Sequence, residues 1–155
     1  MTTPIPPRKR VRYTELTNKP NAQEQYNIHK VSAVLADFGL QVITIQDDSN
    51  GPDFIIKDQD HNLYPIQLKS RITISKKYLK SNKLLMCFPQ NLGKFTDHKH
   101  WYIIPHDDLI TLIGNNTKNA LNTKSWINNG EWSAKSLSKK MHQALTPYLY
   151  SLQED

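Results

Sequence analysis

Three short apolar segments follow one another between residues 42 and 69, separated by two clusters of turn-forming residues. The segments are residues 42–45, 53–57 and 63–69, and the clusters are residues 47–52 and 58–62. Short apolar runs bounded by Asp, Asn, Gly and Pro are typical of β-strands. Because the connections are too short for a crossover, we expect an antiparallel meander. Pro65 cannot donate a ladder hydrogen bond, so the third strand should begin at a sheet edge or a bulge.

A helix is expected before the meander. Apolar residues recur there at helical spacing, and Gly39 stands where such a helix would end. The apolar stripe consists of Ile28, Val31, Val34, Leu35 and Phe38. At the other end, Asn21 is a candidate N-cap and Glu24 stands at the spacing of a capping box.

Further elements are expected after the meander. Two buried-type strands should lie near residues 84–88 and 100–104, followed by a helix at 105–113, a long loop at 114–130 and a last helix at 136–150 with a kink at Pro147. We therefore predict an α/β (α+β) fold in which helices flank a central mixed sheet of about five strands. Residues 21–155 should form one domain, because a chain of 155 residues supports a single core.

The composition favours a soluble protein with a polyanionic partner. Lys and Arg outnumber Asp and Glu by 20 to 14, a formal net charge of +6, although such an excess also occurs as ordinary surface charge. The single cysteine, Cys87, excludes an intrachain disulfide, and its apolar neighbours predict a buried side chain. No stretch approaches the roughly 18 apolar residues of a membrane span, and no signal peptide is evident. We expect a cytoplasmic protein without a membrane partner.

Two basic segments are candidates for nucleic-acid contact. Residues 1–20 are expected to form a disordered basic tail, which either lies along phosphates or stays solvated. The segment after the meander is likewise either a phosphate-contacting patch or a solvated face. The candidate contact residues are Arg8, Lys9, Arg10, Arg12, Arg71, Lys76, Lys77 and Lys80.

Asp53, Gln67 and Lys69 form the most informative constellation. Residues two apart in a strand share a face, so Gln67 and Lys69 point to the same side, and antiparallel pairing can bring Asp53 close to them. A hard cation favours oxygen ligands, a metal can activate water, and a nearby lysine can offset charge on a phosphorane. The alternative is a turn aspartate beside the solvent-exposed face of an edge strand.

Pro52-Asp53 followed by Gln67-Leu68-Lys69 resembles the motif of the PD-(D/E)XK endonuclease superfamily, with Gln in the D/E place. The chain is similar to small bacterial members that include group I intron-encoded homing endonucleases, over roughly residues 24–110. The resemblance implies a restriction-endonuclease-like core and a Mg²⁺-dependent DNA endonuclease in which Mn²⁺ can substitute. It makes Asp53 and Gln67 metal ligands, adds the backbone carbonyl of Leu68, and makes Lys69 the catalytic lysine.

Two departures from this pattern leave alternatives open. The first helix of many superfamily members carries an acidic residue, and Glu24 is either that residue or only a capping-box residue. Gln67 lacks the charge of a carboxylate, so the second hypothesis is a nuclease-fold protein that binds DNA without cleaving it. A third is an RNA-cleaving or toxin-like nuclease. Double-strand cleavage would predict a homodimer or homotetramer, because one site cuts one strand.

Overall fold

The computed structural model describes residues 3–16, 18–45, 51–79, 83–91 and 98–152. Its helices are α1 (Pro20–Ala36), α2 (His106–Asn116), α3 (Lys124–Asn129) and α4 (Lys139–Leu145). Its strands are β1 (Gln41–Thr44), β2 (Phe54–Lys57), β3 (Leu63–Leu68), β4 (Thr73–Ser75), β5 (Leu85–Pro89), β6 (His100–Pro105), β7 (Glu131–Ser133) and β8 (Leu149–Ser151). Four short 3₁₀ helices complete it: η1 (Tyr13–Leu16), η2 (Lys76–Tyr78), η3 (Ala120–Asn122) and η4 (Thr146–Tyr148).

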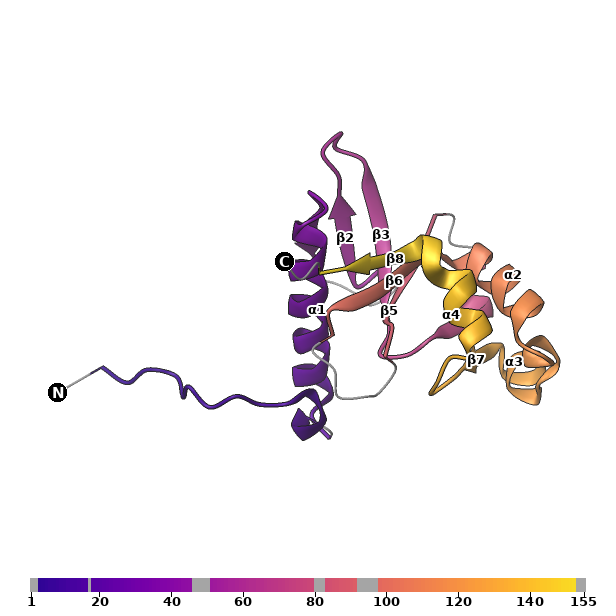
Figure 1. Ribbon diagram of the computed structural model, residues 1–155, viewed down its shortest axis with the longest axis horizontal. Coiled ribbons are helices and arrows are strands. Elements are labelled where there is room, and N and C mark those ends of the chain that lie inside the picture. Colours follow the sequence, from indigo (N-terminus) through magenta and orange to yellow (C-terminus); the bar gives the residue numbers. More distant parts are fainter. Residues whose placement is uncertain (1–2, 17, 46–50, 80–82, 92–97, 153–155) are drawn as a thin grey trace.

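A curled, mixed sheet of six strands organises the fold, in the order β1-β2-β3-β5-β6-β8 (Figure 1). The expected meander is confirmed, because β1, β2 and β3 pair antiparallel in chain order. β5 then adds parallel to β3, and β6 and β8 follow antiparallel. The strand count differs from the expected five, and β4 and β7 form a separate two-stranded sheet.

The central strands are buried on both faces. Met86, Phe88, Tyr102 and Ile104 pack on one side with α2 and α4. Cys87, Trp101 and Ile103 pack on the other side against α1, as their alternation in β5 and β6 requires. We call these the α2–α4 core and the α1 core. The buried stretches at 84–88 and 100–104 were therefore predicted correctly.

α1 lies in the hollow of the curled sheet and contacts both of its edge strands, β1 and β8. Its predicted stripe is buried at Ile28, Val31, Val34 and Leu35. Phe38 is the exception: it lies beyond the end of the helix, is 47% exposed and meets the Tyr150 ring edge to face at 5.0 Å between centroids. Gly39 has a φ of +70°, as expected for the residue that turns the chain after a helix.

Three expected features were wrong. The N-cap of α1 is Lys19 without a side-chain cap, and Pro20 opens the helix, so Asn21 and Glu24 do not form a capping box. The expected loop at 114–130 contains η3 and α3, and Thr123 caps α3 through a hydrogen bond from the N–H of Trp126. The expected last helix is split into α4, η4 and β8, because Pro147 cannot continue an α-helix and lies in a 3₁₀ turn instead.

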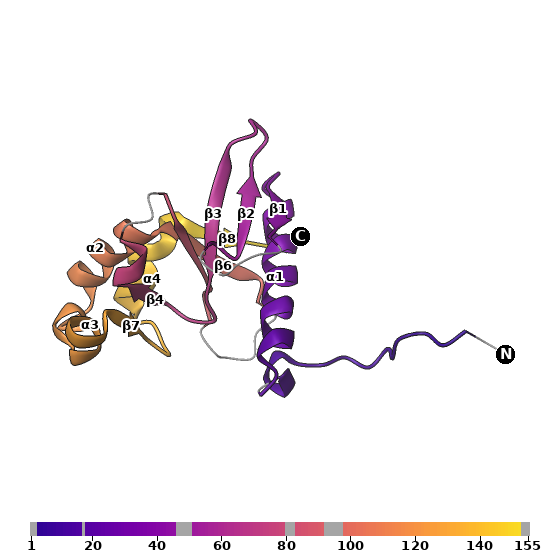
Figure 2. The same ribbon diagram turned by 180° about the vertical axis from the view of Figure 1, so that it is seen from behind.

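The structure also places the N-terminal tail and Pro65. The final part of the expected tail forms η1, and residues 3–12 lead away from the domain (Figure 2). The register of β3 with β5 begins at Ile66, so Pro65 lies where β3 is paired with β2 alone. In the described part of the chain, no helix has the length and apolar character needed to cross a membrane.

Candidate functional site

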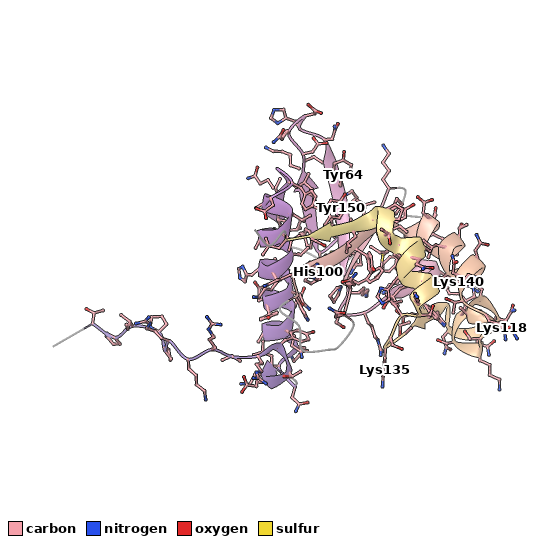
Figure 3. The ribbon with its side chains drawn as sticks, viewed as in Figure 1. Tyr64, His100, Lys118, Lys135, Lys140 and Tyr150 are labelled. Carbon is pink, nitrogen blue, oxygen red and sulfur yellow. The ribbon has the colours of Figure 1, made fainter. Side chains whose placement is uncertain are left out.

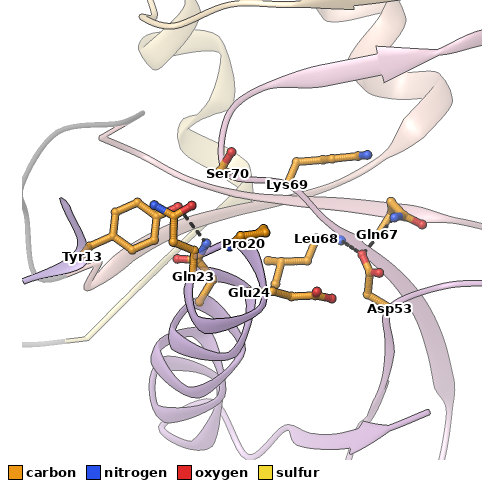
Figure 4. A pocket seen from close by; sticks show the side chains of 10 residues that line it. Tyr13, Pro20, Gln23, Glu24, Asp53, Gln67, Leu68, Lys69 and Ser70 are labelled. Atoms are coloured by element: carbon orange, nitrogen blue, oxygen red, sulfur yellow. Dashed lines mark hydrogen bonds between the residues drawn. The ribbon is translucent and has the colours of Figure 1, made fainter. Parts of the chain in front are cut away.

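A pocket of about 320 Å³ lies between the N-terminal end of α1 and the C-terminal end of β3 (Figure 4). It is lined by residues from η1, α1, the start of β2 and the end of β3. These residues are Tyr13, Pro20, Gln23, Glu24, Asn27, Asp53, Gln67, Leu68, Lys69 and Ser70. The structure thus brings the four candidate catalytic residues, which are separated by up to 45 positions in sequence, to the wall of one pocket.

The backbone pairing of β2 with β3 fixes the position of Asp53. The backbone N–H of Asp53 donates to the carbonyl of Ile66 at 2.8 Å, which extends the antiparallel ladder by one residue. Its carboxylate Oδ2 accepts hydrogen bonds from the backbone N–H of Leu68 at 2.7 Å and from Nε2 of Gln67 at 2.9 Å. The carboxylate is therefore held against the end of β3, as expected from the antiparallel pairing.

Because side chains alternate along a strand, Gln67 and Lys69 lie on the opposite face of β3 from their apolar neighbours. Ile66 and Leu68 pack into the α1 core, so Gln67 and Lys69 point to the other side of β3. Figure 4 shows the ends of Gln67, Lys69, Asp53 and Glu24 directed toward the same side of the pocket. Lys69 is partly buried, and its Nζ lies 5.8 Å from the ring centroid of Tyr78.

The backbone carbonyl of Leu68 also faces the pocket side of β3. The N–H of Lys69 donates to the carbonyl of Cys87 in β5 at 2.8 Å. In a trans peptide the carbonyl opposes the following N–H, so the Leu68 carbonyl points away from β5, toward the side on which Asp53 lies. Asp53, Glu24 and this carbonyl supply only oxygen donors, which fits a hard divalent cation.

Gln67 does not present its oxygen to Asp53 in this structure. Its amide nitrogen donates to the Asp53 carboxylate, so a role as metal ligand requires the amide to turn about its Cγ–Cδ bond. Among the residues that the structure describes, no group of three or more His, Cys, Asp or Glu side chains is arranged to hold a metal ion. Among the described residues that line the pocket, Asp53 and Glu24 carry carboxylates.

Cys87 and the two histidines of the 98–100 stretch are structural. Burial raises the pKa of the Cys87 thiol, and the negative charge of Asp53 raises it further, so Cys87 is not a nucleophile at neutral pH. His98 is buried, and its Nδ1 hydrogen-bonds to Oδ1 of Asn27 at 2.9 Å. His100 hydrogen-bonds to the hydroxyl of Ser151 in β8.

The predicted nucleic-acid contacts lie in segments that adjoin pocket residues in the chain. Arg8, Lys9, Arg10 and Arg12 are exposed and lead into η1, whose Tyr13 lines the pocket. Arg71 follows the pocket residue Ser70, and the exposed Lys76 and Lys77 lie in η2, beyond β4. Lys80 lies outside the described residues. No acidic residue occurs from position 61 to position 96, which makes this stretch uniformly basic.

Five pocket residues were not anticipated from the sequence: Tyr13, Pro20, Gln23, Asn27 and Ser70. Asn27 carried a signal, because it is a polar residue four positions before Val31 on the buried stripe of the helix. It is 3% exposed and donates from Nδ2 to the hydroxyl of Tyr13 at 3.4 Å. Tyr13 carried none, because it stood within a segment expected to be a tail.

Comparison of the chain with known protein families, with characterised proteins and with solved structures gives no match.

Proposed function

We propose that this protein is a divalent-metal-dependent DNA endonuclease built on a restriction-endonuclease-like core. The supporting observation is the pocket that gathers Asp53, Gln67, Lys69 and Glu24 at the end of β3. An N-terminal helix on one face of a mixed sheet, with helices on the other, agrees with that core. One feature departs from the usual crossover between parallel strands, since β4 and η2 take the place of an α-helix between β3 and β5.

In this proposal Asp53, Glu24 and the carbonyl of Leu68 would hold Mg²⁺ or Mn²⁺, and the amide oxygen of Gln67 would be a further ligand if the amide turned. The bound cation would supply charge neutralisation at the phosphoryl oxygens and a lower pKa for its water. Lys69 orients the attacking water and offsets the charge that develops on the phosphorane. The water oxygen attacks phosphorus in line and gives up a proton to solvent, while the P–O bond on the leaving side breaks and the leaving oxygen takes up a proton from solvent.

The substrate assignment rests on charge. Lys69 lines the pocket and is followed along the chain by Arg71, Lys76 and Lys77, while Arg8 to Arg12 precede η1, whose Tyr13 also lines the pocket. Cations on the chain segments that precede and follow the residues of a catalytic pocket suit a polyanion whose backbone extends past the cleaved bond. Cleavage of both strands would require two copies of the chain, in a homodimer or homotetramer.

Plasmid cleavage with Mg²⁺ or Mn²⁺ tests the proposal. We expect wild-type protein to nick or linearise the plasmid, and Lys69→Met to reduce the rate by roughly 100-fold or more, since loss of one charge-stabilising group typically costs this much. Lys57→Met is the matched control, because Lys57 lies in β2 close to the turn that leads to β3. Equal rates for wild type and Lys69→Met would contradict the catalytic role, provided that both proteins have the same melting temperature.

A second candidate function is DNA binding without cleavage. The hydrogen bond from the Gln67 nitrogen to Asp53 favours it, because this contact already occupies Oδ2 of the carboxylate without a cation. Salt-dependent DNA binding together with no heat of Mg²⁺ or Mn²⁺ binding in calorimetry would select this function. A parallel comparison of matched DNA and RNA oligonucleotides decides whether the substrate is RNA.

A further inference from the structure

The aromatic ring of Tyr78 lies beneath two ammonium groups. Lys69 Nζ is 5.8 Å from its centroid and Lys77 Nζ is 5.1 Å from it, both within the range of a cation–π interaction. Tyr78 itself is only 9% exposed and belongs to the α2–α4 core. A fixed ring therefore contacts the long, flexible side chain that is the candidate catalytic lysine.

His106, the first residue of α2, holds this ring in place. The two rings meet edge to face, with centroids 5.4 Å apart and an interplanar angle of 82°. His106 is 2% exposed, and its Nε2 accepts a buried hydrogen bond of 3.2 Å from the backbone N–H of Ser75. Ser75 is in turn the N-cap of η2, the short helix that contains Tyr78.

This arrangement links α2 to the pocket through three contacts: His106 to Ser75, His106 to Tyr78, and Tyr78 to Lys69. Because Nε2 of His106 accepts a hydrogen bond, the ring is neutral and has its proton on Nδ1, which lies 3.5 Å from the carboxylate of Asp107. A lysine has four rotatable bonds, so an ammonium group next to a reacting phosphate needs a contact that selects one conformation.

We propose that Tyr78, held by His106, is a positioning residue that fixes the ammonium group of Lys69 at the edge of the pocket. Its catalytic consequence rests on the endonuclease function proposed above. The position of Lys69 relative to the ring does not, and it can be measured without any activity.

The position is measured by NMR after reductive methylation of the lysines with ¹³C-formaldehyde. The dimethylammonium signal of Lys69, assigned by its loss in Lys69→Arg, should be shifted upfield by the ring current of Tyr78. Tyr78→Phe keeps the ring and should keep this shift, whereas Tyr78→Leu should move the signal to the position of an exposed lysine. A Lys69 signal that is the same in wild type and Tyr78→Leu would overturn the proposal.

The catalytic consequence is measured as separate kcat and KM values on a DNA oligonucleotide. We expect Tyr78→Leu to lower kcat by roughly 10- to 100-fold, the cost of a small misplacement of a catalytic group, with little change in KM. Tyr78→Phe should restore kcat. An unchanged kcat in a folded Tyr78→Leu protein would overturn the positioning role. If wild type itself does not cleave, the endonuclease proposal fails, and the methyl signal still decides whether Tyr78 positions Lys69.

The role of His106 is tested by a conservative variant. His106→Gln offers an amide oxygen to the Ser75 N–H and should keep the ring-current shift of Lys69. His106→Leu removes the acceptor and should reduce the shift. Equal Lys69 signals in wild type and in a folded His106→Leu protein would exclude the histidine from the arrangement and leave Tyr78 as the positioning residue on its own.

Discussion

The carboxylate of Asp53 accepts a 2.7 Å hydrogen bond from the backbone N–H of Leu68, the residue between Gln67 and Lys69. The same carboxylate is the central metal ligand in the proposed mechanism. One side chain thus joins the start of β2 to the end of β3 and also serves the candidate site, so its replacement should change both stability and activity.

Substitution of Asp53 separates these two roles. Asp53→Ala leaves the Leu68 N–H and the Gln67 amide without their acceptor, and we expect a loss of about 1–3 kcal/mol in the free energy of unfolding, as is typical when a partner of a buried hydrogen bond is removed. Asp53→Asn keeps an acceptor oxygen, so its free energy of unfolding should fall by less than that of Asp53→Ala. Neither variant should cleave DNA. Urea unfolding measures the difference. Asp60→Ala, at the exposed β2–β3 turn, is the control, and a stability equal to wild type in Asp53→Ala would contradict the structural role.

His106 should make stability depend on pH in the acidic range. Burial lowers the pKa of His106 below its ordinary value, and Asp107 only partly opposes this effect. The unfolded chain therefore binds a proton near pH 6.5 while the folded chain does not, so the free energy of unfolding falls as the pH falls from about 6.5 through the lowered pKa. Above pH 6.5 the contribution is complete.

Other charged or titratable groups around His106 are Asp107 on its own helix and, from η2, Tyr78 with Lys77 on its ring. Urea unfolding between pH 5 and pH 8 should give a steeper decline for wild type than for His106→Gln. His29→Gln, on the exposed side of α1, serves as the control and should follow wild type. Parallel curves for wild type and His106→Gln would exclude His106 as the source.

Lys76 and Lys77 should contribute to the salt dependence of DNA binding. Lys76 Nζ lies 5.3 Å from the Trp126 ring and Lys77 Nζ lies 5.1 Å from that of Tyr78, so both ammonium groups are held at the exposed surface of η2. Each phosphate contact contributes about 0.9 to the slope of log affinity against log salt, so replacing both lysines by alanine should reduce the slope by roughly 1.8.

The matched control for this pair replaces Lys57 and Lys140 by alanine, which removes the same charge elsewhere. Lys140 projects from α4, whereas β4 and η2 lie on the opposite side of the α2–α4 core (Figures 2 and 3). Fluorescence anisotropy with a labelled duplex in Ca²⁺ measures the slopes without cleavage. Equal reductions in the two double variants would indicate net charge alone, not a contact at η2.

Tyr13 should determine how well the basic arm acts at the pocket. Its ring lies 4.6 Å from that of His98 and 5.3 Å from that of Tyr26, centroid to centroid, which attaches η1 to the domain. Tyr13→Ala should weaken DNA binding but keep the salt slope, because the arm retains its cations and loses only its local concentration at the pocket.

Deletion of residues 1–12 should weaken binding and lower the slope as well. Tyr13→Phe keeps the stacking and should bind like wild type, and an unchanged affinity in Tyr13→Ala would show that the arm does not need this anchor.

Local pattern was sufficient to predict the elements that carry the candidate site. The stripe from Ile28 to Leu35 and the alternation at Ile66 and Leu68 are properties of single elements, and the short turns left only an antiparallel pairing for Asp53 and Gln67. The orientation of the Gln67 amide depends on its contact with Asp53 across two strands. No pattern within either strand could reveal it.

The C-terminal part was less predictable, because its elements are short and depend on tertiary contacts. α4 spans Lys139–Leu145, and β8 forms only by pairing with β6. Residues 149–151 continue an apolar pattern that fits a helix equally well, and pairing with Trp101 and Tyr102 selects the strand. The contact between Tyr78 and Lys69 also depends on the crossover between β3 and β5, whose path the sequence did not show.

The closure of the sheet around α1 has a consequence for synthesis on the ribosome. α1 leaves the exit tunnel early, but the residues that cover its apolar stripe include Trp101 and Ile103, and the ring that meets Phe38 belongs to Tyr150. Phe54 and Ile66 can cover part of this stripe earlier, but its burial is complete only after Ile103 has been synthesised, and the contact at Phe38 requires Tyr150. We therefore expect folding around α1 to be completed only after Tyr150 has left the exit tunnel.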